Sequence, residues 1–184
     1  MHGLVSLLDT EHNAKVESLW YALRDECGLK DFYVTPLPHF SWQVAEDYDW
    51  DELEGLLQSI AAEVKPFTIH TGGLALFTGA NPVIYTPVVR TAELSRIHQM
   101  IWERLAPVSV GACPCYAPSF WMPHISLAYN DVTPETLNCI LNRLAFQTYN
   151  WAIEVDNITL IYEPGGTLGT VKYQFDFGGK DSAS

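Results

Sequence analysis

The sequence HFSW at residues 39–42 has the same pattern as HISL at residues 124–127. Each tetrapeptide reads histidine, apolar residue, serine, apolar residue, and each directly follows a proline, Pro38 or Pro123. Successive side chains of an extended strand point to opposite faces. The histidine and serine of each motif therefore share one face, and the apolar residues on the other face can anchor the strand in a core.

The residues around the two motifs predict a similar order of elements twice, with strand, helix, histidine strand and helix in that order. We expect Thr10 and Asp49 to be the N-caps of the first two helices, and Gly28 to end the first. Residues 107–118 are expected to be irregular, and Gly165-Gly166 to form a turn. The expected strands cover residues 3–9, 40–45, 67–71, 74–77, 83–89, 122–129, 151–162 and 170–177, and the expected helices residues 11–27, 50–64 and 91–106 and a fourth from Thr133-Pro134.

This pattern indicates a degenerate internal duplication within one domain that covers residues 1–184. We expect an α+β fold in which two similar lobes of mainly antiparallel sheet, with helices outside, surround a central cleft. The length of 184 residues suits one sizeable core, and no linker separates the halves. Residues 178–184 are small and polar, which is typical of a disordered tail.

The chain is acidic, with 22 aspartates and glutamates against 10 lysines and arginines and a formal net charge of −12. Such a balance argues against tight binding to long nucleic acid, which needs a positive surface. A small phosphorylated ligand stays possible, because a few local cations can hold one phosphate. Arg90 and Lys172 are candidates for that role, although solvated surface positions are the expectation for both.

No apolar run approaches the roughly 18 residues of a membrane span, and no signal peptide pattern is present. We therefore expect a cytoplasmic protein without a membrane partner, and a monomer. Its four cysteines, Cys27, Cys113, Cys115 and Cys139, are expected to be reduced structural thiols, with a disulfide or metal role for Cys113 and Cys115 as the alternative. We expect no metal site and no cofactor.

Two histidines that face one cleft suit the hydrolysis of a cyclic phosphodiester. Histidine titrates near neutral pH, so one imidazole can deprotonate the attacking water while the other protonates the leaving oxygen. The hydroxyls of Ser41 and Ser126 can donate hydrogen bonds to the nonbridging phosphate oxygens. The alternative interpretation is that His39 and His124 are two packed, partly buried histidines, but their matched context favours catalysis.

In these two motifs the chain resembles the two-histidine phosphoesterases. That superfamily includes the RNA 2′,3′-cyclic phosphodiesterases, also called 2′-5′ RNA ligases. The signature of that superfamily is a pair of such histidine motifs, here 85 residues apart. GLVSLLD at 3–9, FTIHTGGLALFTG at 67–79 and VIYTPVV at 83–89 extend the resemblance. Many members have threonine where this chain has serine, and the RNA-processing members tend to have a more basic cleft.

The resemblance implies a bilobal fold, His39 and His124 as the catalytic pair, and Ser41 and Ser126 as phosphate-binding hydroxyls. We expect Trp121, just ahead of His124, to contact the substrate by stacking on a base. The expected activity is metal-independent hydrolysis of a 2′,3′-cyclic phosphate on a nucleotide or short RNA end. Alternatives are ligation or hydrolysis of a 2′-5′ linkage, a binding module that captures a nucleotide or RNA end without turnover, and a metallohydrolase.

Overall fold

The structure is a computed structural model that describes residues 1–30, 36–163 and 169–178. Its elements, in chain order, are β1 (His2–Leu7), α1 (Thr10–Cys27), β2 (His39–Ala45), β3 (Asp47–Tyr48), α2 (Trp50–Glu63), β4 (Phe67–His70), β5 (Ala75–Phe77), β6 (Val83–Pro87), α3 (Ala92–Leu105), β7 (Ser109–Val110), the 3₁₀ turn η1 (Pro114–Tyr116), β8 (His124–Ala128), α4 (Pro134–Leu144), β9 (Ala152–Val155), β10 (Asn157–Tyr162) and β11 (Thr170–Asp176).

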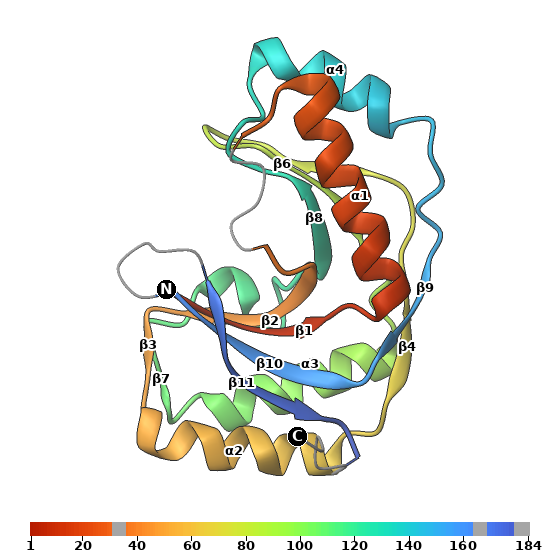
Figure 1. Cartoon of the computed structure of the whole chain (residues 1–184). Coiled ribbons are helices and arrows are strands. Elements are labelled where there is room, and N and C mark those ends of the chain that lie inside the picture. The colour runs from red at the N-terminus through yellow and green to blue at the C-terminus, as the bar shows by residue number, and fades with distance from the viewer. Residues whose placement is uncertain (31–35, 164–168, 179–184) are drawn as a thin grey trace.

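The strands form antiparallel sheets, and the helices lie outside them, so the expected α+β class is confirmed. One sheet has the order β11-β10-β1-β2 and another the order β5-β6-β8 (Figure 1). Two smaller ladders pair β4 with β9 and β3 with β7. Each histidine strand, β2 or β8, is therefore an edge strand of its own sheet.

The predicted order of strand, helix, histidine strand and helix is present twice, but the lobes are not the two halves of the chain. Helix α1 follows β1 yet packs against β8 and α4, whereas α3 follows β6 and packs against β2. Figure 1 shows α1 and α4 beside β6 and β8, and α2 and α3 below the sheet that contains β1. Periodicity predicts which face of a helix is buried, but it does not say which sheet that face covers.

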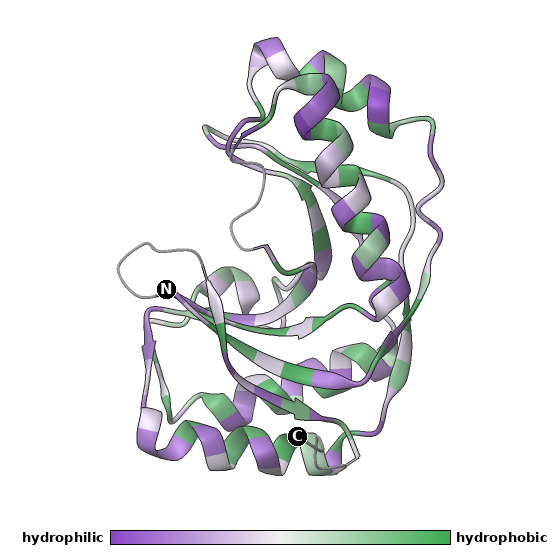
Figure 2. Ribbon diagram, in the orientation of Figure 1, coloured by the Kyte–Doolittle hydropathy of each residue, from purple (hydrophilic) through white to green (hydrophobic). Residues whose placement is uncertain are grey.

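Local signals fix the helix ends. The Asp9 side chain accepts a hydrogen bond from the His12 amide at 2.8 Å, so Asp9 caps α1 and the expected N-cap at Thr10 is wrong. Gly28 ends α1 in the left-handed conformation, with φ of 73°, as predicted. Asp49 caps α2, as predicted. Figure 2 shows that the helices carry apolar residues along one side.

Two other expectations need correction. The strand expected over 151–162 is broken at Asp156, because β9 pairs with β4 whereas β10 pairs with β1 and β11. The stretch 107–118, expected to be irregular, contains β7 and η1. The expected turn at Gly165-Gly166 and residues 179–184 of the expected tail at 178–184 lie outside the described residues.

The apolar residues of the two motifs lie in the core, as the alternation predicts. Phe40 and Trp42 on β2, like Ile125 and Leu127 on β8, have no exposed surface. Their burial on one face directs the histidine and serine of each strand to the other. Because large-to-small changes at such positions cost several kcal/mol, these four residues hold the site in place.

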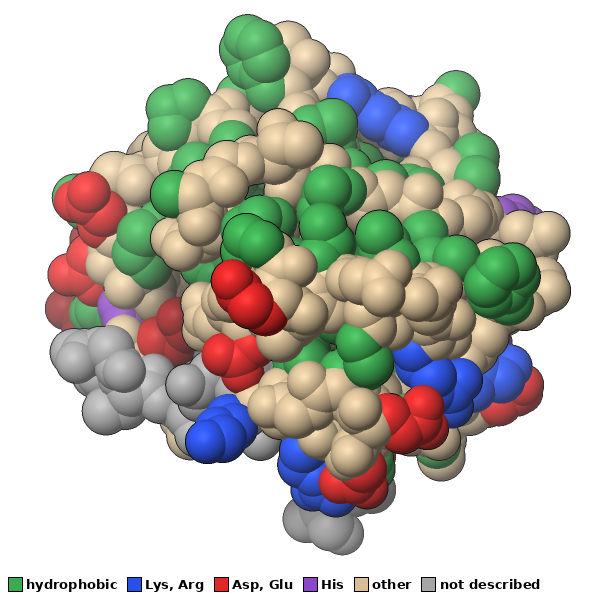
Figure 3. All heavy atoms as spheres, turned by 90° about the horizontal axis from the view of Figure 1, so that it is seen from above, with side chains coloured by type: hydrophobic (Ala, Val, Ile, Leu, Met, Phe, Trp, Pro, Cys, Tyr) green, Lys and Arg blue, Asp and Glu red, His purple; other side chains and the backbone are tan. Residues whose placement is uncertain are grey.

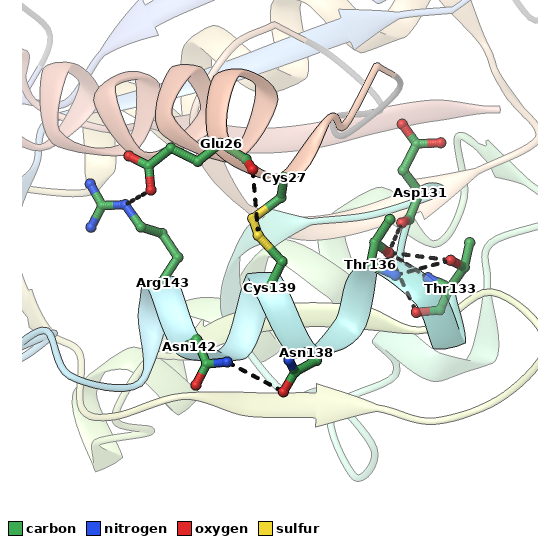
Figure 4. Close-up of a disulfide and its surroundings, with 9 residues drawn as sticks. All are labelled: Glu26, Cys27, Asp131, Thr133, Thr136, Asn138, Cys139, Asn142 and Arg143. Atoms are coloured by element: carbon green, nitrogen blue, oxygen red, sulfur yellow. Dashed lines mark hydrogen bonds and ion pairs between the residues drawn. A yellow bond between two sulfur atoms is a disulfide. The ribbon is translucent and has the colours of Figure 1, made fainter.

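The expectation of reduced thiols is wrong, because all four cysteines are paired. Cys27 at the end of α1 is bonded to Cys139 on α4 (Figure 4). Cys113 is bonded to Cys115. An ion pair between Glu26 and Arg143, with 3.0 Å between nitrogen and oxygen, lies beside the first disulfide. Cys27 and Cys139 are 112 positions apart in the sequence, so the sequence did not indicate their proximity, which arises because α1 and α4 pack together.

The end of the molecule formed by α1 and α4 faces the viewer in Figure 3. Apolar side chains lie across much of this face, and acidic side chains gather mostly toward its edges. Phe146, just after α4, is 89% exposed. Among the described residues, none of the helices has the length and hydrophobicity needed to cross a bilayer.

Candidate active site

The two histidine strands bring the predicted residues to one cavity. Strands β2 and β8 lie against each other where the two sheets meet. His39, Ser41, His124 and Ser126 all line a cavity of about 400 Å³ at this junction. The four side chains come from segments 85 residues apart and are brought together by the fold alone.

Both imidazoles are oriented by the same backbone contact. The Nδ1 atom of His39 lies 2.5 Å from the Leu37 carbonyl oxygen, and Nδ1 of His124 lies 2.7 Å from that of Met122. A carbonyl oxygen can only accept, so each Nδ1 carries the hydrogen and donates it. In the neutral ring Nε2 is then the basic atom, and it is the nitrogen left to exchange a proton with a ligand.

Burial keeps both imidazoles neutral when the cavity is empty. Burial is the main cause that lowers the pKa of His39 to about 4. The hydrogen bond to the Leu37 carbonyl acts in the opposite direction, and the nearby His124 adds a smaller lowering effect. Burial also lowers the pKa of His124, and the Met122 carbonyl partly opposes this. A phosphate anion between the rings would raise both pKa values, because an opposite charge favours the protonated form. The site can therefore gain its acid when an anionic substrate binds.

Tyr116 is a member of the site that the sequence did not indicate. Its side chain lines the same cavity, beside that of Ser41. Burial raises the pKa of the Tyr116 hydroxyl, so this group stays protonated at neutral pH. It can thus orient the Ser41 hydroxyl. Its place after Cys-Pro-Cys, in a stretch expected to be irregular, carries no periodic signal that could have revealed it.

The expected contact of Trp121 with the substrate stays a prediction, because the side chain is largely buried yet still lines a cavity beside His124. The side chain is 2% exposed, and its ring lies parallel to that of His98 with centroids 3.7 Å apart. The indole Nε1 donates a hydrogen bond to the Ser41 carbonyl oxygen at 2.9 Å. Trp121 therefore positions β2 against the segment before β8. His98, to which no role was assigned, forms part of the same packing.

Arg90 and Lys172 are engaged outside the cavity. The Arg90 guanidinium donates to the carbonyl oxygens of Pro118 and Trp121, and so supports the segment that leads into β8. The Lys172 ammonium lies 3.7 Å from the centroid of the Trp50 ring. Among the described residues that line the cavity, none is lysine or arginine. The described residues also contain no group of three or more side chains that could hold a metal ion.

The chain is similar to several known proteins. Residues 9–167 match the family described as the 2'-5' RNA ligase superfamily. A protein of Bacillus thuringiensis (strain Al Hakam) named "Putative phosphoesterase" is 24% identical over 149 residues, which cover 79% of this chain and 82% of that protein. A similarly named protein of Bacillus cytotoxicus is 25% identical over the same length.

Two solved structures share the fold. TT0787 of Thermus thermophilus superposes with a TM-score of 0.66 at 16% identity, over 97% of this chain and 98% of its own. LigT of E. coli, complexed with 3'-AMP, superposes with a TM-score of 0.56 at 14% identity, over 96% of each chain. At these identities the likeness concerns the arrangement of the chain and not its substrate.

Proposed function

The chain belongs to the 2'-5' RNA ligase superfamily, and from this membership we propose that it is a metal-independent phosphoesterase acting on a cyclic phosphodiester. The substrate we propose is a 2′,3′-cyclic phosphate on a nucleotide or on a short RNA end. The observation that carries the proposal is the pair of matched imidazoles, each bonded through Nδ1 to a carbonyl two residues earlier, above one cavity. The 3'-AMP held by LigT supports a small phosphorylated ligand.

In the proposed reaction a water molecule attacks phosphorus while Nε2 of one histidine takes its proton. The bond from phosphorus to one ribose oxygen breaks, and the second histidine, protonated through its Nε2, gives that oxygen a proton. Each positioned acid or base contributes about 10²- to 10⁴-fold in rate. Ser41 and Ser126 donate hydrogen bonds to the nonbridging oxygens as their charge rises. The product is a phosphate monoester beside a free hydroxyl.

The proposal is tested with a panel of nucleoside 2′,3′-cyclic phosphates and of short oligonucleotides with cyclic phosphate ends. We expect His39→Ala and His124→Ala each to lower kcat at least about a hundredfold, and EDTA to leave wild-type turnover intact. His70→Ala is the matched control, because His70 is exposed on β4 and lines no described part of the cavity. Near-normal turnover in both site variants would refute the proposal.

The family description favours a second candidate activity, the making or breaking of a 2′-5′ linkage by the same four residues. Acid and base exchange roles in the two directions of one reaction. Incubating an RNA that ends in a 2′,3′-cyclic phosphate with one that carries a 5′-hydroxyl tests this, and a 2′-5′ joined product would support it. Calorimetric binding of cyclic phosphates without any product would instead indicate a binding module.

A further inference from the structure

A second cavity opens beside the catalytic imidazole of His124. It has a volume of about 660 Å³, and Tyr116 and His124 line both cavities. The described residues that line it are Phe77, Pro114, Cys115, Tyr116, Phe120, Trp121, Met122 and His124. A group attached to a phosphate at His124 can therefore reach this second cavity without leaving the protein surface. We call it the apolar pocket.

The side chains of the apolar pocket offer little hydrogen bonding. Of the eight described lining residues, Tyr116, Trp121 and His124 alone carry side-chain nitrogen or oxygen atoms. The Trp121 nitrogen already donates to the Ser41 carbonyl, and the Tyr116 and His124 side chains also face the first cavity. The remaining members are apolar, sulfur-containing or aromatic. A ligand in this pocket is thus held by burial of apolar surface and by shape.

The rim of the pocket exposes large apolar side chains in a supported segment. Phe120 is 68% exposed and Met122 is 58% exposed, on either side of the buried Trp121. Arg90 bonds the carbonyls of Pro118 and Trp121, and the Phe120 amide donates to the Ala117 carbonyl at 2.8 Å. A rim that is already ordered loses little freedom when a ligand binds.

Aromatic surface of the pocket continues up to the His124 ring. The rings of Phe77 and His124 meet edge to face, with centroids 4.9 Å apart and planes at 82°. Phe77 in turn stacks on Tyr85, with centroids 4.1 Å apart. The pocket is therefore continuous with the reacting site on the His124 side, and its walls favour a flat ring.

We propose that the apolar pocket binds a ring-shaped apolar group of the substrate, and that it selects this group by shape and not by its hydrogen-bonding pattern. This inference rests on the proposed function. The substrate class is then a cyclic phosphodiester whose sugar carries a flat ring, with little distinction between rings that differ in their donors and acceptors. A site that reads a base needs hydrogen bonds to it, since rejection of close analogues depends on them.

Three substrates that share one ribose 2′,3′-cyclic phosphate test the inference: adenosine, a 1-phenyl riboside and a 1-O-methyl riboside. The phenyl ring has the shape of a base without its hydrogen-bonding atoms, and the methyl compound has no ring. We expect kcat/KM to be similar for adenosine and phenyl compounds and at least about tenfold lower for the methyl compound, mainly through KM.

The variant Phe120→Ala should lower the ratio of kcat/KM between phenyl and methyl compounds at least about fivefold. The exposed position of Phe120 makes a folded variant the expectation, and thermal melting checks it. Phe146→Ala is the matched control, because Phe146 is also an exposed phenylalanine and lines neither cavity. Its ratio should equal that of the wild type.

Three results would overturn the inference: equal kcat/KM for all three compounds, a tenfold preference for adenosine over phenyl, or an unchanged ratio in Phe120→Ala. Turnover of the methyl compound that depends on His39 tests the proposed function separately. If no compound is hydrolysed, the proposed function fails. The pocket is then tested by calorimetry, which measures the binding of the 3′-phosphates of the phenyl and methyl ribosides. Tighter binding of the phenyl compound that Phe120→Ala removes supports the pocket, and equal binding refutes it.

Discussion

At the scale of single residues, the site depends on two hydrogen bonds from imidazole to backbone. Each bond fixes the ring so that Nε2 is its free basic nitrogen, and burial keeps that nitrogen unprotonated in the empty cavity. The same burial makes the two histidines destabilising when the solution is acidified. The pH dependence of stability therefore reports on the site without any knowledge of the substrate.

Acidification should weaken the folded protein through His39. Its pKa is 6.5 in the unfolded chain and about 4 in the folded protein, so between these values the unfolded chain binds more protons. The free energy of unfolding should fall as the pH drops from about 6.5 to 4, by at most about 3 kcal/mol from this residue. Urea unfolding at pH 7, 5.5 and 4 measures it.

His39→Asn removes the titrating group, so its free energy of unfolding should fall less over this range than that of the wild type. Other groups, such as the buried His98 whose pKa is also about 4, contribute equally to both proteins and cancel in the difference. The same pH dependence in both proteins would contradict the assigned burial of His39.

The serine hydroxyls make a second residue-scale prediction. Ser126→Ala removes the hydroxyl that we propose as a donor to the phosphate, and it should lower kcat about a hundredfold. Ser126→Thr keeps the hydroxyl and should retain most of the activity. Kinetics on a nucleoside 2′,3′-cyclic phosphate separate the two variants. If the alanine variant were as active as the threonine variant, the hydroxyl would have no part in the reaction.

Site residues that belong to a sequence pattern could be predicted, and those outside any pattern could not. His39, Ser41, His124 and Ser126 were found because strand alternation decides which side chains share a face. The structure puts all four in one cavity. For Trp121 the position beside a motif does not distinguish stacking on a ligand from the stacking on His98 that the structure shows.

At the scale of elements, strand and helix types were largely predicted, but their partners were not. Local periodicity marks the buried face of α1, whereas its packing on β8 arises from contacts more than a hundred residues apart in sequence. The same applies to the break between β9 and β10, since only the different partners of the two strands require it. The disulfide from α1 to α4 is a consequence of this packing.

The Cys27–Cys139 bond should stabilise the protein by holding α1 against α4 (Figure 4). A crosslink restricts the unfolded chain more when it closes a longer loop, and this one joins residues 112 apart. We expect Cys27→Ser with Cys139→Ser to lower the free energy of unfolding by about 2–4 kcal/mol in urea titrations.

The pair Cys113→Ser and Cys115→Ser is the control for loop length, because that bond joins residues only two apart. It should cost clearly less stability than loss of the long-range bond. A larger loss from the short loop than from the long one would show that the stabilisation does not come from restricting the unfolded chain.

At the scale of the whole molecule, the net negative charge of the protein should favour short substrates over long RNA. The net charge is −12, and the described lining of the cavity contains no lysine or arginine. Each further phosphate of a long RNA therefore meets repulsion that a mononucleotide avoids. At low ionic strength we expect kcat/KM to be lower for an RNA of about 20 nucleotides with a 2′,3′-cyclic end than for the matching nucleoside cyclic phosphate.

Added salt should then raise kcat/KM for long RNA, whereas it weakens RNA binding by most enzymes that act on nucleic acids. Because salt screens the repulsion, raising it from about 0.02 to 0.2 M should increase kcat/KM for the long RNA. For a protein that neutralises phosphates with lysines and arginines, the same change lowers affinity steeply. The nucleoside cyclic phosphate, measured in parallel, corrects for effects of salt on the chemistry. A fall in the ratio of long to short substrate with added salt would mean that a basic surface guides the RNA, and the acidic balance of the chain would then not limit its substrates.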